Sequence, residues 1–184
     1  MRELSLNVMD VAQNSVRAQA SVVRITVNES EKDDRLSIEI ADDGCGMSEE
    51  QVRQVIDPFF TTRTTRKVGL GVPLFKLSAE QTGGSFDIKS KLGEGTTTTA
   101  VYVSSHMDMT PLGDINSTVK ILIQCNPQID FVFTHSTDLG SFTLDTRELR
   151  EVLGDVSLDN PDVLEWIGQY LEENTQNIYG GAEK

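Results

Sequence analysis

Hydrophobic and polar positions follow two different periods along the first hundred residues. Apolar residues recur three and four positions apart between Leu4 and Val16, which predicts an amphipathic helix ending near Ala18. A second helical pattern runs from Leu70 to Gln81. Elsewhere polar and apolar residues alternate, which predicts strands at residues 22–27, 35–40, 85–90 and 96–103. We expect the first two strands to be antiparallel neighbours because only a charged turn separates them.

The pattern changes after residue 103. Turn residues cluster at 104–113, and we place a domain boundary there, with residues 1–105 as the first domain. The remainder predicts a helix at 114–124, a hairpin at 129–145, a short helix at 146–153 and a longer helix from residue 160. We interpret residues 106–180 as a small α/β interaction module and residues 181–184 as a frayed tail. A module of this size is only marginally stable alone, so we expect it to pack on the first domain or on a partner.

The strand at 35–40 ends in an acidic residue followed by a Gly-x-Gly turn. The alternation carries Asp42 onto the buried face, where a carboxylate needs hydrogen-bond donors. The exocyclic amine of adenine is a suitable donor. Gly44 and Gly46 would let the backbone turn closely around the adenine ring, and Met47 follows directly after them. Asp-x-Gly-x-Gly also describes many surface turns, so this segment alone leaves both interpretations open.

The predicted hairpin of residues 85–103 places a hydroxyl near the same carboxylate. Thr96 begins its second strand. We expect the Thr96 hydroxyl to hold Asp42 through a direct or a water-mediated hydrogen bond.

Asp10 and Asn14 lie four residues apart on the first predicted helix and therefore share one face. An asparagine oxygen can be one ligand of Mg²⁺ whose other ligands are phosphate oxygens and waters, and a carboxylate one turn away can orient or deprotonate a water. The alternative is a solvated helix face, and the pair alone favours that alternative.

A basic, hydroxyl-rich segment follows a short helix that Ser48 and Gln51 predict through a capping signature. The segment begins with aromatic residues and ends in a Gly-x-Gly that opens the helix ending at Gln81. Its candidate residues are Phe59, Phe60, Thr61, Thr62, Arg63, Arg66, Lys67, Gly69, Leu70 and Gly71. Apolar anchors, cations and the free N–H groups of a helix amino terminus are the parts of a hinged cover over phosphates. The alternative is a mobile surface loop.

Composition and charge limit the classes of function. The chain has 184 residues, with 29 acidic against 16 basic side chains, which argues against nucleic acid or an anionic membrane as a partner. No apolar run is as long as a membrane span, and the amino end lacks the features of a signal peptide. Cys45 and Cys125 are too few and too far apart for a disulfide framework or a metal cluster. We therefore expect a cytoplasmic protein.

In this order and at these intervals, the segments resemble the ATP-binding domain shared by gyrase, heat-shock chaperone, histidine-kinase and mismatch-repair ATPases (GHKL). The resemblance covers residues 4–103. Its ordered motifs are residues 10–14 (N box), 42–46 (G1 box), 58–60 (F box), 69–71 (G2 box) and 93–96 (G3 box). The Phe-Phe-Thr-Thr-Arg stretch places the chain closest to the histidine-kinase branch.

The resemblance implies an α/β (α+β) two-layer sandwich whose mixed, mostly antiparallel sheet is covered by helices on one face. It implies ATP and Mg as cofactors, with Asn14 as the magnesium ligand, Asp42 as the adenine-reading carboxylate and Gly46 in the pocket wall. Residues 61–71 would form the ATP lid, in which Arg63 and Lys67 neutralise phosphate charge. The other nucleotide-binding residues that it implies are Gly44, Met47, Phe60, Thr61, Thr62, Gly69, Leu70, Gly71 and Thr96.

Two departures from the family pattern concern the chemistry. Hydrolytic members usually carry Glu where this chain has Asp10, and the shorter side chain argues against efficient water activation by this candidate base. Because the sequence starts almost at the N box, we expect no upstream helix that carries a phosphoacceptor histidine. His106 falls in the linker and His135 in an apolar strand pattern. The whole chain is similar to stand-alone kinase-like ATP-binding proteins of anaerobic bacteria.

We expect an ATP-dependent protein kinase that transfers the γ-phosphoryl group to a protein acceptor in trans, or an ATPase. The alternative is a binding module in which ATP or ADP occupancy sets the lid conformation and residues 106–180 report it to a protein partner. A slow hydrolytic clamp is a third option. A homodimer through residues 106–180 is open in each case.

Overall fold

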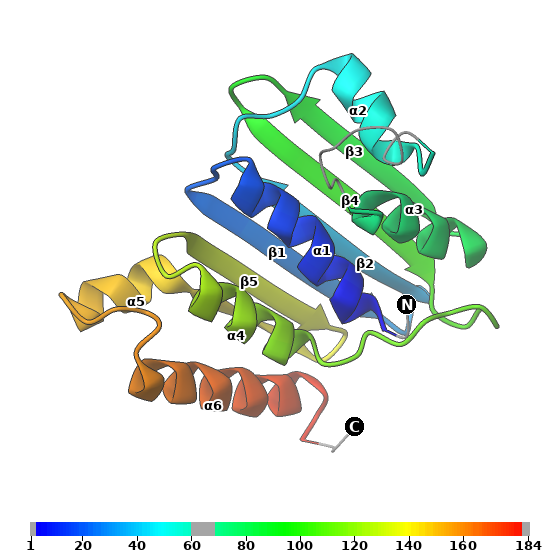
Figure 1. Cartoon of the computed structure of the whole chain (residues 1–184). Helices are drawn as coiled ribbons and strands as arrows, with labels where there is room; N and C mark the ends of the chain where they lie inside the picture. The colour runs from blue at the N-terminus through cyan, green and yellow to red at the C-terminus, as the bar shows by residue number, and fades with distance from the viewer. Residues whose placement is uncertain (1–2, 60–68, 182–184) are drawn as a thin grey trace.

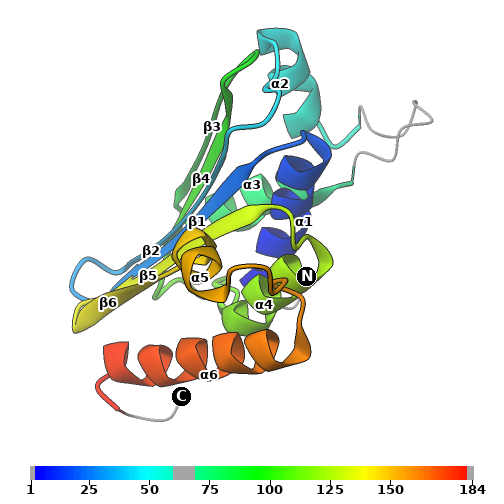
Figure 2. The same cartoon turned by 90° about the vertical axis from the view of Figure 1, so that its left-hand side faces the viewer.

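A six-stranded sheet organises the chain in the computed structural model, which describes residues 3–59 and 69–181. The strand order is β3-β4-β2-β1-β5-β6, with helices on one face (Figures 1 and 2). The strands are β1 Val22–Ser30, β2 Arg35–Asp42, β3 Ser85–Lys91, β4 Gly95–Val103, β5 Asp130–Thr137 and β6 Gly140–Asp145. β1 and β5 are parallel, and the other neighbours are antiparallel. The predicted sandwich with a mixed, mostly antiparallel sheet is confirmed, and so is the pairing of β1 with β2.

The described residues form six helices, several of which begin at recognisable caps. They are α1 Leu4–Arg17, α2 Glu49–Ile56, α3 Gly71–Gln81, α4 Ile115–Cys125, α5 Thr146–Leu153 and α6 Pro161–Ile178. The Ser48 hydroxyl accepts the Gln51 N–H while the Gln51 side chain accepts the Ser48 N–H, so the predicted capping box opens α2. The side chains of Asp114 and Asn160 likewise accept backbone N–H groups at the starts of α4 and α6. Within residues 3–59 and 69–181, none of the helices combines the length and hydrophobicity that crossing a membrane requires.

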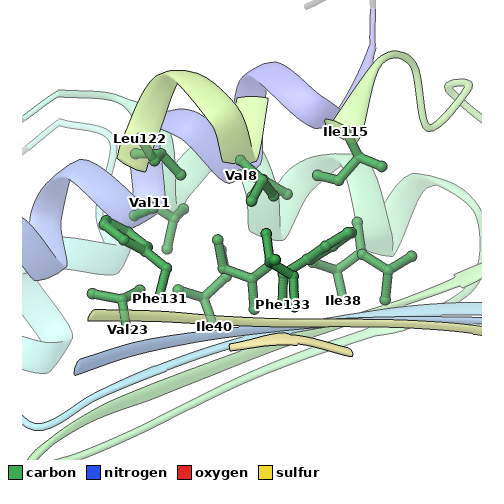
Figure 3. Packing of buried hydrophobic residues seen from close by; sticks show 14 of the residues in the cluster. Val8, Val11, Val23, Ile38, Ile40, Ile115, Leu122, Phe131 and Phe133 are labelled. Atoms are coloured by element: carbon green, nitrogen blue, oxygen red, sulfur yellow. The ribbon is translucent and has the colours of Figure 1, made fainter. Parts of the chain in front are cut away.

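The hydrophobic core lies between the sheet and the helices that cover it. Burial alternates along β1 and β2 as the sequence predicts. The inward-facing side chains of these strands, each at most 3% exposed, are Val23, Ile25, Val27, Leu36, Ile38 and Ile40. They meet the apolar face of α1, whose Val8 and Val11 point onto the sheet (Figure 3). Burying one such side chain contributes about 1.5–3 kcal/mol, so the core fixes α1 against the strands.

The segment after residue 106 continues the same sheet and the same core. β5 lies beside β1, with Val22 opposite Asp130. Phe131 and Phe133 of β5 are buried in the same cluster as Ile38 of β2 (Figure 3). The segment therefore packs on the first half of the chain through strand pairing and shared burial. Its interpretation as a module of its own stays a prediction.

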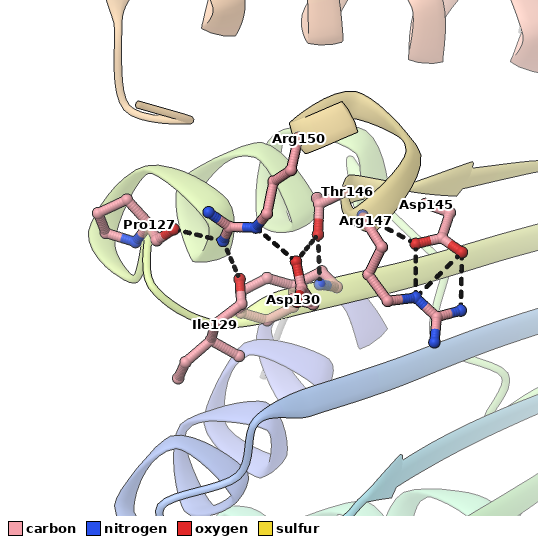
Figure 4. A network of polar contacts seen from close by, with 8 residues as sticks. Pro127, Ile129, Asp130, Asp145, Thr146, Arg147 and Arg150 are labelled. Atoms are coloured by element: carbon pink, nitrogen blue, oxygen red, sulfur yellow. Dashed lines mark hydrogen bonds and ion pairs between the residues drawn. The ribbon is translucent and has the colours of Figure 1, made fainter. Parts of the chain in front are cut away.

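A polar network holds α5 beside the first residue of β5 (Figure 4). Asp130 Oδ1 accepts hydrogen bonds from Arg150 Nε (2.7 Å) and Thr146 Oγ1 (3.0 Å). The Thr146 hydroxyl oxygen accepts the Phe131 N–H (2.9 Å). The Asp130 N–H donates to the Ser21 carbonyl (2.9 Å), so the network reaches the segment between α1 and β1.

Candidate functional site

The last residue of β2 carries the carboxylate on which the candidate site depends. Asp42 lies opposite Val23 of β1 and Thr96 of β4, and it is half-buried. Its Oδ1 accepts the Gly44 N–H (2.8 Å), and its Oδ2 accepts the Ser15 hydroxyl of α1 (2.6 Å). The helix and the turn therefore hold opposite oxygens of one carboxylate.

Thr96 does not make the direct bond to Asp42 that was one of the two forms expected. Its Oγ1 lies 2.7 Å from the Oγ of Ser90, which is its partner on β3. Two hydroxyls pair readily because each can donate and accept. The direct hydroxyl donor to Asp42 is Ser15, which sequence reasoning missed as a functional residue. The available signal was a serine at an apolar position of the helix, since a buried hydroxyl needs a partner.

Hydrogen bonds attach the turn after β2 to the segment between α1 and β1. Asp43 Oδ1 accepts the N–H groups of Ser21 (2.7 Å) and Val22 (3.0 Å). The Cys45 N–H donates to the Ala18 carbonyl (2.9 Å). One side of the turn is therefore fixed to the end of α1.

The other side of the turn is attached to the β3–β4 hairpin. The Gly93 N–H donates to the Cys45 carbonyl (2.8 Å). The Met47 N–H donates to Ser90 Oγ (2.8 Å). Because both sides are bound, residues 42–47 are held in place before any ligand arrives.

Gly44 and Gly46 are required where the turn passes its neighbours. A Cβ on Gly44 would lie 2.8 Å from the Ala18 Cβ. Gly46 has a φ of +69°, and a Cβ there would lie 2.0 Å from the Lys91 carbonyl oxygen. The close backbone approach expected of both glycines is present, whereas their contact with a nucleotide stays a prediction.

α1 carries Asp10 and Asn14 one helical turn apart, as the sequence predicts. Asn14 is half-buried, and its Oδ1 accepts a hydrogen bond from Arg17 Nη1 (3.3 Å). Asp10 is exposed, and α3 begins next to it, because a Cβ on Gly71 would lie 2.8 Å from the Asp10 Cβ. The amino terminus of α3 therefore adjoins the candidate base.

These oxygen donors fit a magnesium ion that is held mainly by nucleotide and water. In the part of the chain that the structure describes, no group of three or more His, Cys, Asp and Glu side chains could hold a metal ion. Mg²⁺ that is bound together with substrate phosphates needs only one or two protein oxygens. Asn14, with Asp10 one turn away, could supply them.

Part of the predicted site lies outside the described residues. This part includes Phe60, Thr61, Thr62, Arg63, Arg66 and Lys67, whose roles stay predictions. The described chain resumes at Gly69, and α3 begins at Gly71 after Leu70.

Segments that are distant in the sequence thus meet at one end of the sheet. Ser15 of α1 reaches Asp42, which lies opposite Thr96, and Gly71 of α3 adjoins Asp10. The arrangement combines a fixed carboxylate, glycine-lined backbone and a helix face with oxygen donors. It can accept hydrogen bonds from a planar base at one point and supply oxygen ligands along α1.

Residues 2–106 match the family model described as "Histidine kinase-, DNA gyrase B-, and HSP90-like ATPase". The chain belongs to this family. Its GHKL ATPase domain includes every motif from Asp10 to Thr96. The resemblance inferred from those motifs is therefore confirmed.

The GHKL chain also resembles a curated sensor protein. Over 102 residues it is 38% identical to "Sensor protein SrrB" of Staphylococcus aureus (strain NCTC 8325 / PS 47), a match that covers 53% of this chain and 17% of that protein. The match therefore spans less than a fifth of the relative.

Two solved structures share the fold of the GHKL chain. "Crystal Structure of N terminal domain of a DNA repair protein" has a TM-score of 0.53 and 13% identity, and covers 79% of this chain and 52% of that one. "Aquifex aeolicus MutL ATPase domain complexed with ADP" has a TM-score of 0.50 and 14% identity, and covers 83% of this chain and 69% of that one. Each of these structures matches a larger part of this chain than residues 2–106 make up. The likeness in fold therefore extends into the segment that follows residue 106.

Proposed function

We propose that the protein binds ATP with Mg²⁺ and transfers the γ-phosphoryl group to a protein acceptor in trans. The observation that carries the proposal is the Asp42 carboxylate, which Ser15 and Gly44 hold at the same end of the sheet as Asn14. Membership of the GHKL family supports nucleotide binding. The MutL ATPase domain of similar fold is complexed with ADP, and SrrB is a sensor protein, and both facts agree with the proposal.

Asp42 is the residue that we assign to the adenine base. Each of its oxygens accepts one hydrogen bond in the described structure, and a carboxylate oxygen can accept another. The exocyclic amine of adenine can donate that bond, whereas the corresponding carbonyl of guanine would face the carboxylate as a second acceptor. The close backbone turn at Gly44 and Gly46 provides the adjacent wall.

The phosphate end of the nucleotide is assigned to α1 and the lid. Asn14 would hold Mg²⁺, which supplies positive charge to the phosphate oxygens when bound. Asp10 is the side chain that we assign to the attacking hydroxyl or water, and Arg63 and Lys67 of the lid are the cations that we assign to the transferred phosphoryl group. Positioning and charge compensation supply most of the catalysis of this class of reaction.

A nucleotide-gated binding module is the second candidate function. Asp10 is exposed and shorter than the Glu of hydrolytic relatives, which favours slow turnover or none. β5 and β6 extend the sheet that carries Asp42, so the segment after residue 106 is suited to report occupancy to a protein partner or to a second copy. A slow ATPase is the remaining variant of this proposal.

Calorimetric titration of ATP with Mg²⁺ tests nucleotide binding. The wild type should bind, and Asp42→Asn should bind at least tenfold more weakly, because hydrogen bonds to a charged group are worth about 1.5–3 kcal/mol. Asp87→Asn is the matched control, since Asp87 is an exposed acid on the edge strand β3. Absence of binding in the wild type, or equal binding by Asp42→Asn, would refute the assignment.

Activity assays of the wild type and of Asp10→Asn distinguish the candidate functions. Transfer of label from γ-labelled ATP to a protein in a lysate of the source cell supports the kinase. Phosphate release without transfer, lost in Asp10→Asn, supports the ATPase. Binding without either reaction, together with a protein captured in only one nucleotide state, supports the gated module.

A further inference from the structure

Ser15 uses its hydroxyl in a way that is unusual for a helical serine. It is 3% exposed, on the buried face of α1. A serine within a helix commonly donates to the backbone carbonyl four residues earlier. Here the hydroxyl donates instead to Asp42 Oδ2 (2.6 Å), a residue 27 positions away in the sequence.

The two donors on Asp42 fix the plane of its carboxylate. The terminal torsion of an aspartate is broad and would otherwise let the group rotate. The Gly44 N–H holds Oδ1 at 2.8 Å, and the Ser15 hydroxyl holds Oδ2 at 2.6 Å. Gly44 contributes a local bond within the turn, whereas Ser15 supplies the bond from another element.

The position of Ser15 is itself fixed by the core. Its neighbours on α1, Val11 and Ala12, are at most 4% exposed. The hydroxyl is therefore presented to Asp42 without further ordering when a ligand binds. A group that is oriented in advance does not lose conformational freedom on binding, which strengthens binding.

We infer that Ser15 is a positioning residue that makes the site selective for purines with a 6-amino group. This inference rests on the proposed function, in which Asp42 meets the base. Ser15 acts through Asp42, because its hydroxyl orients the carboxylate so that a free acceptor position faces the amine. Asn14, the adjacent residue of α1, serves the metal ion, so consecutive residues of one helix serve the two ends of the nucleotide.

The test compares ATP with purine riboside triphosphate, which lacks the 6-amino group, by calorimetric titration with Mg²⁺. Ser15→Ala should weaken ATP binding about tenfold, the loss expected for one hydrogen bond to a charged group, and should change binding of the analogue less than about twofold. In the double variant with Asp42→Asn, Ser15→Ala should cause no further loss for ATP, because its effect passes through Asp42. Ser5→Ala is the matched control, since Ser5 is equally buried on α1 and the structure gives it no bond to Asp42.

The possible outcomes separate this inference from the proposed function. A wild type that binds neither nucleotide overturns both. A wild type that binds the two nucleotides equally leaves ATP binding in place but overturns the contact between Asp42 and the amine, and with it the role of Ser15. A wild type that prefers ATP, with the preference kept in Ser15→Ala or with both nucleotides weakened alike, overturns the role of Ser15 alone. Ser15→Cys, which keeps the shape of serine with a larger atom that donates only weakly, replaces the alanine variant if circular dichroism shows that the latter is unfolded, and its expected results are the same in direction.

Discussion

Gly46→Ala should destabilise the protein more than Gly83→Ala, although both glycines have a left-handed backbone. Their φ angles are +69° and +78°, and alanine in this conformation costs about 1 kcal/mol. A Cβ on Gly83 would meet no atom within 4 Å, whereas a Cβ on Gly46 would lie 2.0 Å from the Lys91 carbonyl oxygen. The difference between the variants therefore isolates the contact between the 42–47 turn and the β3–β4 hairpin.

The structure sets the magnitude of this difference. A contact of 2.0 Å cannot persist, so the hairpin must move away from the turn. Such movement breaks the bonds from Gly93 N–H to the Cys45 carbonyl and from Met47 N–H to Ser90 Oγ. At about 1 kcal/mol for each bond, Gly46→Ala should lower the free energy of unfolding by about 3 kcal/mol, against about 1 kcal/mol for Gly83→Ala.

Urea unfolding followed by circular dichroism measures the free energy of unfolding of both variants and of the wild type, and thermal unfolding measures their Tm. In a protein of this size 1 kcal/mol shifts Tm by about 2–4 °C, so the two variants should differ by about 4–8 °C. Gly46→Ala should also weaken ATP binding, since the turn that it displaces includes Asp42. Equal losses of unfolding free energy in the two variants would refute the claim that the hairpin holds the turn.

Two further predictions concern carboxylates. Asp43→Ala should weaken ATP binding several-fold, because it removes the two hydrogen bonds from Ser21 and Val22 that hold the turn. Asp34→Ala is the control and should leave the affinity for ATP unchanged, because Asp34 accepts its bonds from Ser105 at the other end of β2. Equal affinities in the two variants would contradict this role of Asp43. The Arg147 side chain, by its hydrogen bonds, holds the pKa of Asp145 below its usual value, so this carboxylate stabilises the fold above about pH 4 and less as the pH falls through its lower folded-state value. Asp145→Asn should therefore lower the urea midpoint at pH 7, and its difference from the wild type should shrink as the pH falls below about 4. A difference that stays the same as the pH falls would count against the ion pair.

The elements of the site were predictable because their signals are local. The alternation along β2 placed Asp42 at the end of a buried strand, and the helical period placed Asp10 and Asn14 on one face. The contact between Ser15 and Asp42 joins residues 27 positions apart. The spacing of hydrophobic residues in the sequence does not indicate which hydroxyl contacts which carboxylate. The sequence placed Thr96 near Asp42, but the side-chain torsions that direct its hydroxyl to Ser90 belong to the folded sheet.

The sequence pattern did not indicate the position of β5 beside β1, for a different reason. Antiparallel neighbours such as β1 and β2 are joined by a short turn, which the sequence shows. The parallel pair β1 and β5 has no such turn, and its register joins Val22 to Asp130 across most of the chain. The pattern at 129–134 therefore indicated a strand and its hairpin partner at 141–145, but it did not indicate the pairing with β1.

The two neighbours of β1 are synthesised at very different times. β2 follows it directly, but β5 begins only at Asp130, and at about 5–20 residues per second the ribosome needs roughly 5–20 seconds to make the intervening chain. During that interval one edge of β1 presents unpaired N–H and C=O groups beside its valine and isoleucine side chains, which is a template for association with other chains. Contacts of such long sequence separation also form slowly. Completion of the sheet is thus a late folding step, and a shortened chain that ends before β5 would keep this edge open permanently.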